Sequence, residues 1–407
     1  MLSVVSVDLS LPSFSSHNFS EFVATHLNNA QKEAVFHNNG SIVVIAAAGS
    51  GKTRVITSRI TYLLTEKKAS SSSIVALTFT NKAAQEMRER VIEYTHGSQN
   101  NIPFIGTFHS YCLQLLRMHS DALPFQNFTI LDEDDKKSLL TKLLKRSVLE
   151  KKHTAQSLSH HISRFKNQLP EAQAGLFIQE HPQLFVIMQE YEKEKKQNKC
   201  FDFDDLLLEV LHLFKKNPEV KKQHQQRVRH LMVDEYQDTN TIQHALLKEM
   251  ALDGKGNLAI DSICVVGDED QSIYSWRGAT VDNIIDFKKE FKNTTLIKIE
   301  QNYRSKQPIL SIANKLICHN SKRNEKKIWS DKKGTDCVRA LKCLSSYQEA
   351  EIVGRLCKLL YDDPKSSSTA VLYRTHFQSR VIEECLLRHS IPYKIIGGIR
   401  FYERKEI

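Results

Sequence analysis

Hydrophobic and polar positions follow two different periods along the chain. Between residues 41 and 94, the short β-branched runs IVVIA (42–46) and IVALTF (74–79) are each followed by a stretch with helical spacing, up to Thr65 and from Lys82 to Tyr94. Short apolar runs that alternate with longer helical segments are typical of strands buried in a parallel sheet. The pattern therefore predicts an α/β fold with a doubly wound parallel sheet.

From about residue 110 to residue 200 the strand signal disappears and charged helical patterns replace it. In DEDDKKSLLTKLLKRSVLEKK the apolar residues recur at three- and four-residue steps, and Asp132 occupies the position expected of an N-cap. Later the alternation resumes with TLIKIEQN, a helix from Pro308 to Asn320, the strand-like TAVLYR, a helix through Leu387, and YKII. We therefore expect a helical insertion and a second α/β segment.

The first apolar run ends at a loop of small residues that opens a helix, in the string IVVIAAAGSGKT. Gly49 and Gly51 allow backbone N–H groups to turn inward around phosphates, Lys52 supplies positive charge, and Thr53 offers a hydroxyl to Mg²⁺ at the helix N-terminus. The strict form of this motif has glycine where this chain has Ala46. The sequence predicts a site for a nucleoside triphosphate and Mg²⁺.

Two later apolar runs end in acidic or amide side chains. VRHLMV is followed by Asp234, which is suited to hold Mg²⁺, and by Glu235, which is suited to orient or deprotonate an attacking water. A lone Asp-Glu pair after a strand is more often a solvated turn, so this interpretation depends on the phosphate loop. ICVVGDEDQSIYSWRGA then presents Gln271, whose amide can hydrogen-bond a γ-phosphate. We expect the three strand ends to line one edge of the sheet.

Seven segments occur in the order AAAGSGKT, LTFTNKAAQEMRER, GTFHS, FDFDDLL, VDEYQDTN, VVGDEDQSIYSWRGA and IEQNYRS. In this order they resemble the motif series of the UvrD/Rep/PcrA family of superfamily 1 DNA helicases, in which alanine at position 46 is ordinary. The resemblance extends from LNNAQKEAV at Leu27 to the last residue. It implies a RecA-like P-loop NTPase motor domain with a helical insertion, followed by the first part of a second RecA-like domain.

The resemblance also implies a division of the chain. It consists of a flexible leader over 1–25, motor domain 1A over 26–280 with insertion 1B at about 110–200, and an incomplete motor domain 2A over 281–407. In the family, the chain continues past FYERKEI and supplies a second arginine to the γ-phosphate. Because such an arginine is worth about 10³ to 10⁵ in rate, this chain is expected to hydrolyse ATP poorly or not at all and to lack unwinding.

For the nucleotide site the resemblance adds three residues beyond the loop. It implies that Gln31 reads adenine, that Tyr303 stacks on the base, and that Arg304 reaches the γ-phosphate from the second motor domain. The expected ATP-binding residues are Gln31, Ala48, Gly49, Ser50, Gly51, Lys52, Thr53, Arg54, Tyr303 and Arg304. Thr53 and Asp234 are expected to hold Mg²⁺, and the residues expected to act in catalysis are Lys52, Glu235, Gln271 and Arg304.

A single nucleic-acid strand is held by base stacking, worth about 1 to 3 kcal/mol per base, and by phosphate contacts. The resemblance implies DNA contacts at Thr78, Phe79, Asn81, Thr107, His109, Phe203, Tyr274, Trp276 and Arg277. Taken alone, His109 is more often a structural residue, and an aromatic next to a strand end is more often buried. Trp276 differs because it lies in a polar loop. HHISRFKNQ at 160–168 is either a nucleic-acid contact or a solvated helix face.

The composition agrees with a polyanionic partner. The chain has 57 Lys and Arg residues and 47 Asp and Glu residues, which gives a net charge of +10 and a pI near 9.0.

The 8 cysteines include no C-x-x-C pair and are interpreted as reduced thiols, not as disulfides or metal ligands. No apolar run approaches the about 18 residues of a membrane span. The Ser-rich N-terminus fits neither a transit peptide nor a secretory signal. We expect an intracellular protein without a membrane partner, nuclear in a eukaryote or cytoplasmic in a bacterium.

The resemblance implies an ATP-dependent 3′-to-5′ DNA helicase or translocase of repair or recombination. Its partners would be single-stranded DNA and junctions between single and double strands. Residue chemistry alone supplies neither the polarity nor a choice between DNA and RNA. Two alternatives stay open from the sequence: a fragment that binds ATP or single-stranded DNA without motor activity, and an unrelated P-loop ATPase that acts on protein or small molecules.

Overall fold

The structure is a computed structural model of the 407-residue chain. It describes residues 19–67, 69–95, 102–147, 149, 152–167, 171–334, 338–364 and 368–396. The chain divides into two compact units, and the division falls between Thr335 and Asp336. Within the described residues, no helix is both long enough and apolar enough to cross a membrane.

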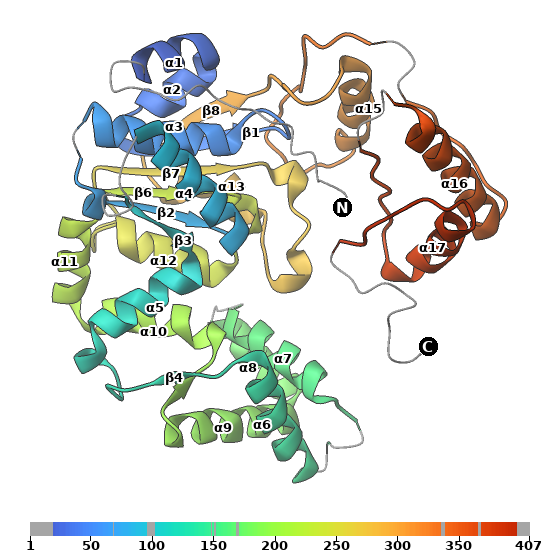
Figure 1. Ribbon diagram of the computed structural model, residues 1–407. Coiled ribbons are helices and arrows are strands. Elements are labelled where there is room, and N and C mark those ends of the chain that lie inside the picture. The colour runs from blue at the N-terminus through green and yellow to red at the C-terminus, as the bar shows by residue number, and fades with distance from the viewer. Residues whose placement is uncertain are drawn as a thin grey trace. The chain divides into compact units, whose positions relative to one another are not determined.

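The larger unit is built on a six-stranded sheet in which every pairing is parallel (Figure 1). Its strands are β1 (Gly40–Ala46), β2 (Ile74–Thr78), β3 (Phe104–Thr107), β6 (His230–Val233), β7 (Ser262–Gly267) and β8 (Thr295–Ile299). Their order is β3-β2-β6-β7-β1-β8. Because the strands are parallel, all their carboxyl ends meet at one edge, which is where open α/β sheets bind ligands.

The strands are almost wholly apolar because helices cover both faces of the sheet (Figure 1). One face packs against α5 (Phe108–Met118), α10 (Phe203–Lys216) and α12 (Thr241–Ala251). The other is covered by α2 (Asn29–Phe36), α3 (Lys52–Thr65) and α4 (Asn81–Thr95). Side chains alternate along β1, so Val43 and Ile45 join the first core while Ile42 and Val44 face the second layer. The expected doubly wound α/β fold is confirmed, as are the helices predicted at α3 and α4.

The expectation of a flexible leader over 1–25 is wrong for its last residues, which form α1 (Phe19–His26). Phe19, Phe22 and Val23 are at most 3% exposed, and the Phe22 ring lies 5.3 Å from that of Tyr94 on α4. Their three- and four-residue spacing is helical, but it follows a Ser-rich stretch that obscures it. Residues 1–18 of the expected leader lie outside the described residues.

The predicted insertion is helical. It comprises α6 (Glu133–Lys145), α7 (Ala155–Asn167), α8 (Glu171–Glu180) and α9 (Pro182–Gln197), whose buried leucines form a core of their own. Asp132 caps α6, because its carboxylate accepts a hydrogen bond of 2.8 Å from the Asp135 N–H. Two short strands that the pattern did not reveal, β4 (Thr129–Ile130) and β5 (Cys200–Phe201), pair at its base. The predicted start of the insertion at about residue 110 is wrong, because α5 (Phe108–Met118) packs in the core of the sheet. The helix α11 (Pro218–Arg227) also packs against that core through Val220.

The predicted boundary at residue 280 differs from the structural division. The strand β8 pairs with β1 from Ile42↔Thr295 to Ala46↔Ile299. The short helices α13 (Asp282–Ile285) and α14 (Phe287–Glu290) contribute to the same core, and α15 (Gln307–Ile317) also lies within the larger unit. A hydrophobic run predicts that a strand forms but does not name its neighbour in the sheet, so the pattern alone did not place β8 beside β1.

The smaller unit contains α16 (Ser346–Asp362) and α17 (Ser379–Arg388), with Cys357, Leu386 and Ile391 buried between them. The helix predicted through Leu387 is confirmed as α17. The strands predicted at TAVLYR and YKII are not formed within 368–396, and Leu372 is 93% exposed. A strand requires a hydrogen-bonded neighbour, and neither segment has one among the described residues of this unit.

Candidate nucleotide site and nucleic-acid groove

The phosphate loop connects β1 to α3 at the carboxyl edge of the sheet. Gly49 and Gly51 both have left-handed backbone, with φ of +67° and +89°. A Cβ on Gly49 would lie 2.7 Å from Cβ of Arg304 and 2.8 Å from Nδ2 of Asn302, so only glycine fits there. The Asn302 amide donates to the Ala48 carbonyl over 2.5 Å. The loop is thereby fixed at the N-terminus of a 14-residue helix, which is a ready anion site.

Thr53 and Asp234 face each other beside this loop. The Thr53 hydroxyl is 3.5 Å from Oδ2 of Asp234, which is 5% exposed. Burial, followed by the charge of Glu235, raises the pKa of Asp234 to about 7. A buried carboxylate next to a hydroxyl offers the hard oxygen ligands that Mg²⁺ prefers. The two residues therefore fit the ion, which when bound would neutralise charge on the phosphates.

Glu235 follows β6 and points to the loop lysine. Its Oε2 is 3.1 Å from Nζ of Lys52 and accepts a 2.8 Å hydrogen bond from Nε2 of Gln237. The backbone of Glu235 has φ of +50°, which is unusual for a residue with a side chain. Such a conformation costs of order 1 to 3 kcal/mol and is common at functional sites. The sequence-predicted trio of Lys52, Asp234 and Glu235 is thus brought together.

A chain of hydrogen bonds connects Glu235 to Gln271. Gln237, in η4 (Tyr236–Asp238), donates to Glu235 and accepts from the Asp268 N–H over 2.9 Å. Asp268 in turn accepts a 2.6 Å hydrogen bond from Nε2 of Gln271 in η5 (Glu269–Gln271). The sequence pattern alone indicates no role for Gln237 or Asp268, although they lie within VDEYQDTN and VVGDEDQSIYSWRGA. The chain links the ends of β6 and β7.

Gln31 is fully buried, and both of its amide atoms are engaged. Its Oε1 accepts from the Asn28 N–H over 2.9 Å, completing a capping box on α2, and its Nε2 donates to the Ser50 carbonyl over 2.8 Å. In this conformation Gln31 braces the phosphate loop against α2. Its predicted contact with adenine stays a prediction.

Tyr303 and Arg304 follow β8 and lie beside the phosphate loop. The Tyr303 N–H donates to the Gly49 carbonyl over 2.9 Å, and its ring, 40% exposed, is anchored by a 2.9 Å hydrogen bond from the Asn28 amide. Arg304 is exposed. The expectation that these residues approach from a second motor domain differs from the structure, because β8 is in the same sheet as the loop. Arg54 is half-buried on the first turn of α3.

Beside the nucleotide site lies a groove of about 570 Å³. Five of the residues predicted to contact DNA line it, namely Thr78, Phe79, Thr107, His109 and Trp276. Two more adjoin it: the Tyr274 ring is 5.0 Å from that of Phe79, and the Phe203 ring is 6.2 Å from that of His109. Asn81 is exposed at the start of α4 and is not among the lining residues, and the side chain of Arg277 lies outside the described part of the chain.

The groove presents aromatic surface to solvent. Trp276, in η6 (Ser275–Arg277), is 62% exposed, and Phe203 is 42% exposed. Burial lowers the pKa of His109, although Asp204 opposes this effect, which favours a neutral imidazole that is able to hydrogen-bond a ligand. Exposed aromatic rings beside neutral polar groups suit sequence-tolerant stacking of bases.

The helical insertion supplies the opposite wall. His160, Ser163, Arg164 and Asn167 of α7 all line the groove. His160 and Arg164 are exposed in this groove, so both alternatives for HHISRFKNQ, a nucleic-acid contact and a solvated helix face, stay open. Asn240, which follows η4, donates from Nδ2 to Oδ1 of Asn167 over 3.0 Å. The segment from residue 234 to residue 240 thus touches both the nucleotide site and the groove.

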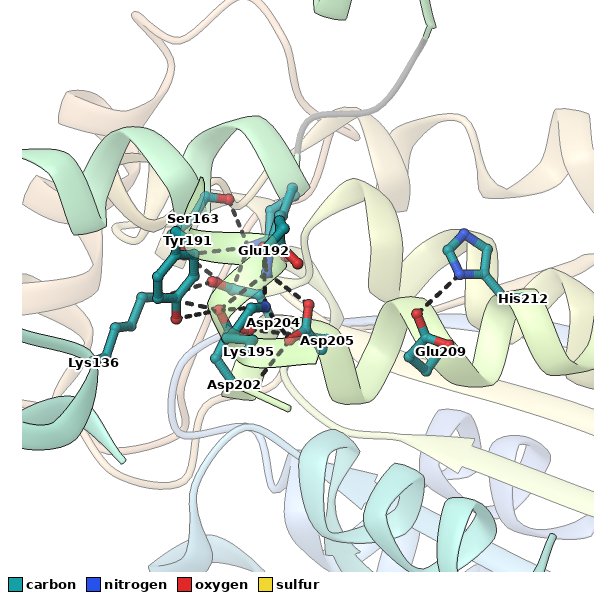
Figure 2. A network of polar contacts seen from close by, with 12 residues as sticks. Lys136, Ser163, Tyr191, Glu192, Lys195, Asp202, Asp204, Asp205, Glu209 and His212 are labelled. Atoms are coloured by element: carbon teal, nitrogen blue, oxygen red, sulfur yellow. Dashed lines mark hydrogen bonds and ion pairs between the residues drawn. The ribbon is translucent and has the colours of Figure 1, made fainter. Parts of the chain in front are cut away.

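A buried ionic cluster holds this wall in place (Figure 2). Lys166 of α7 donates to Asp202 over 3.0 Å and to Asp205 over 2.6 Å, while Lys195 of α9 pairs with the same two carboxylates. Burial acts to raise the pKa of Asp202, but Lys166, Lys195 and Lys136 together lower that pKa far below its usual range. Since both partners are buried, removal of one leaves an uncompensated charge. Sequence reasoning missed these lysines because a Lys-rich helix normally indicates solvent.

Comparisons with known proteins identify the family to which the chain belongs. The UvrD/REP helicase N-terminal domain matches residues 27–292, and the UvrD-like helicase C-terminal domain matches residues 297–407. The ATP-dependent DNA helicase PcrA of Staphylococcus epidermidis is 41% identical over 388 residues, and that of Staphylococcus aureus is 40% identical over the same length. Each alignment covers 94% of this chain and 52% of the relative, so the chain spans about half the length of these relatives.

Among solved structures, a Pif1 helicase from Candida albicans aligns with a TM-score of 0.38 and 12% identity, over 91% of this chain and 55% of that one. The assignment rests on the family models and on the sequence identity to the PcrA proteins. The chain belongs to the UvrD/Rep/PcrA family of helicases.

Proposed function

We propose that this chain is the ATP-binding motor portion of a DNA helicase or translocase that couples ATP hydrolysis to movement along single-stranded DNA. The observation that carries the proposal is the position of two sites at one sheet edge. The phosphate loop and the aromatic groove are both contacted by the segment from Asp234 to Asn240. Family membership removes the alternative of an unrelated P-loop ATPase.

The proposed chemistry follows from the geometry. Lys52 and the α3 N-terminus are placed to bind the β- and γ-phosphates. Thr53 and Asp234 would hold Mg²⁺, which would stabilise the charge that develops during transfer. Nucleotide phosphates compete with Glu235 for Lys52, which frees the Glu235 carboxylate to orient the attacking water. A Cβ added at Gly49 would lie 2.7 Å from Cβ of Arg304. Arg304 is therefore close enough to the phosphate loop to contact the γ-phosphate.

ATP hydrolysis would be coupled to the bound single-stranded DNA through two hydrogen-bonded routes. One passes from Glu235 through Gln237 and Asp268 to Gln271, five residues before Trp276 in the sequence. The other passes from the same segment through Asn240 to Asn167 on the insertion wall. A change at the γ-phosphate can thereby alter the groove from both sides.

The finer features of the proposal come from the family. They are the 3′-to-5′ direction, use at junctions of single- and double-stranded DNA, and a role in repair or recombination. An intracellular location is also proposed, because the cysteines are scattered along the sequence without C-x-x-C pairs. Polarity is tested with duplexes that carry either a 3′ or a 5′ single-stranded tail. Faster displacement or translocation on the 5′ tail would contradict the proposed direction.

The central experiment for function is the ATP hydrolysis rate of the 407-residue chain with and without a single-stranded DNA oligonucleotide. Because the sequence predicts slow ATP hydrolysis at most for this chain, we expect a low basal rate that DNA stimulates, and we expect Lys52→Ala to abolish both rates. The same measurement with an RNA oligonucleotide of the same sequence shows whether DNA or RNA stimulates hydrolysis. The alternative, a chain that binds ATP or DNA without turnover, predicts binding of both ligands with no stimulation.

A further inference from the structure

Three side chains of metal-ligand type meet where α16 packs on α17 in the smaller unit. Sγ of Cys385 is 3.6 Å from Oε2 of Glu351, and Nε2 of His389 is 3.4 Å from Oε1 of the same carboxylate. One ligand atom from each of the three residues lies within 4.8 Å of the other two. Cys385 and His389 are four residues apart, so the helix turns both toward Glu351 on α16.

The two distances end on different oxygens of Glu351, and the ligand atoms of the three residues lie near enough to one another to share one ion. Zn²⁺ binds thiolate sulfur at about 2.3 Å and imidazole nitrogen or carboxylate oxygen at about 2.0 to 2.2 Å. We propose that Glu351, Cys385 and His389 bind one Zn²⁺, with a water molecule as the fourth ligand. This site lies outside the nucleotide site and the groove, and it does not depend on the proposed function.

Gly354 gives independent support to the site. It lies within α16, where glycine costs about 0.5 to 1 kcal/mol relative to alanine. A Cβ at this position would lie 2.5 Å from Sγ of Cys385 and 3.0 Å from Cδ2 of His389. Glycine therefore makes the room in which the thiol and the imidazole approach Glu351. It stands three residues after Glu351, on the same face of the helix.

The charges of the ligands allow a neutral complex. A glutamate carboxylate is ordinarily ionised near neutral pH, whereas a cysteine thiol is ordinarily protonated. Binding then replaces the thiol proton: Zn²⁺ and R–SH give R–S–Zn⁺ and one H⁺, and the Glu351 carboxylate cancels the remaining charge. Arg355 and Arg388 also pair with Glu351, but both are mostly exposed, so turning them into solvent costs little.

No pattern in the sequence marks this site, because its ligands come from two separate helices and lack the paired-cysteine spacing of common zinc motifs. The proposal therefore departs, for Cys385 alone, from the interpretation of the cysteines as reduced thiols that bind no metal. Zinc would fasten α16 to α17 where their shared core consists of a few apolar side chains. A metal ligated by both helices stabilises the folded unit directly.

Titration of the full chain with Co²⁺, after reduction and removal of bound metal and in excess Mg²⁺, tests the proposal. One equivalent of Co²⁺ should produce thiolate-to-cobalt charge-transfer absorption and the d–d bands of tetrahedral Co²⁺, and Zn²⁺ should displace it. Cys385→Ser should remove the charge-transfer band. His389→Ala should weaken binding by about tenfold or more, because even residues that only support a ligand have effects of that size. Zn²⁺ should also raise the melting temperature of the wild-type chain.

Two matched variants control for the other thiols. Cys357→Ser changes a buried thiol on α16 that is outside the trio, and Cys318→Ser changes an exposed thiol of the larger unit. Both should keep the wild-type spectrum, and circular dichroism checks that every variant is folded. Absence of a charge-transfer band in the wild-type chain overturns the proposal, as does a band that persists in Cys385→Ser. Tetrahedral Co²⁺ without thiolate absorption overturns it too, and would point to the histidines around His161.

Discussion

The Gln237 side chain donates from Nε2 to Oε2 of Glu235 across 2.8 Å, and its Oε1 accepts from the Asp268 N–H across 2.9 Å. Gln237 is 1% exposed, so its amide is the fixed link between the ends of two neighbouring strands. Both of these partners lie outside the phosphate loop, and the side-chain hydrogen bonds of Gln237 among the described residues include no residue of that loop. Its removal therefore separates the effect of the link from the loss of a phosphate contact.

Gln237→Ala should lower the free energy of unfolding by about 1 to 3 kcal/mol, because it leaves the buried Asp268 N–H without its partner. Urea unfolding measures this change. The exposed Gln85→Ala should stay within about 0.5 kcal/mol of the wild-type value. Equal free energies of unfolding for Gln237→Ala and Gln85→Ala would show that the hydrogen bonds of Gln237 do not stabilise the fold.

Lys52→Ala should abolish measurable Mg-ATP binding while the fold stays intact. Lys52 supplies the positive charge at the phosphate loop, and its Nζ pairs only with Glu235 among the ion pairs of the described residues. Calorimetric titration with Mg-ATP checks the result. Lys82→Ala, at a side chain that is 88% exposed on α4, is the matched control and should bind normally. Unchanged binding by Lys52→Ala would count decisively against the nucleotide site.

Trp276→Ala should weaken binding of a single-stranded oligonucleotide by about 1 to 3 kcal/mol, because one base can no longer stack on the indole ring. Fluorescence anisotropy gives the affinity. Ile273→Ala, in the same loop and 70% exposed, is outside the groove lining and should leave the affinity unchanged. If Trp276→Ala lowers the melting temperature strongly and leaves DNA affinity intact, the indole is a packing residue instead.

The free energy of unfolding should decrease as the pH is lowered from about 6.5 to about 4, because His224 is buried in the folded chain. Burial lowers its pKa to about 4, from 6.5, and its Nε2 lies 2.8 Å from the Tyr111 hydroxyl. The unfolded chain binds the proton more readily, so the contribution is complete above about pH 6.5 and is lost as the pH falls toward 4, by up to about 3 kcal/mol.

Urea unfolding of the wild-type chain and of His224→Phe at pH 7.5 and pH 5 measures this contribution. The wild-type chain should lose more stability on acidification than the variant does. His212→Phe, at an imidazole that is half exposed, should retain the wild-type pH dependence. Equal slopes for wild type and His224→Phe would refute the assignment.

The sequence predicted most reliably what local chemistry determines. The phosphate loop, Asp234 and Glu235 lie at the ends of the expected strands because each motif combines an apolar run with a turn that only certain residues permit. The sequence did not predict that β8 joins the first sheet, since strand order depends on partners distant along the chain. It also missed the buried role of Lys166 and Lys195, because burial of a lysine depends on carboxylates supplied by another helix.

The most direct test of the account is the Mg-ATP dissociation constant of the 407-residue chain, measured with and without saturating single-stranded DNA. If the segment from Asp234 to Asn240 couples the two sites, DNA should change the Kd by about fivefold or more, and ATP should change the DNA affinity by the same factor. Trp276→Ala should reduce the coupling while leaving the Kd in the absence of DNA unchanged. Mg-ATP binding with one Kd regardless of DNA would contradict the claim that the two sites work as one motor.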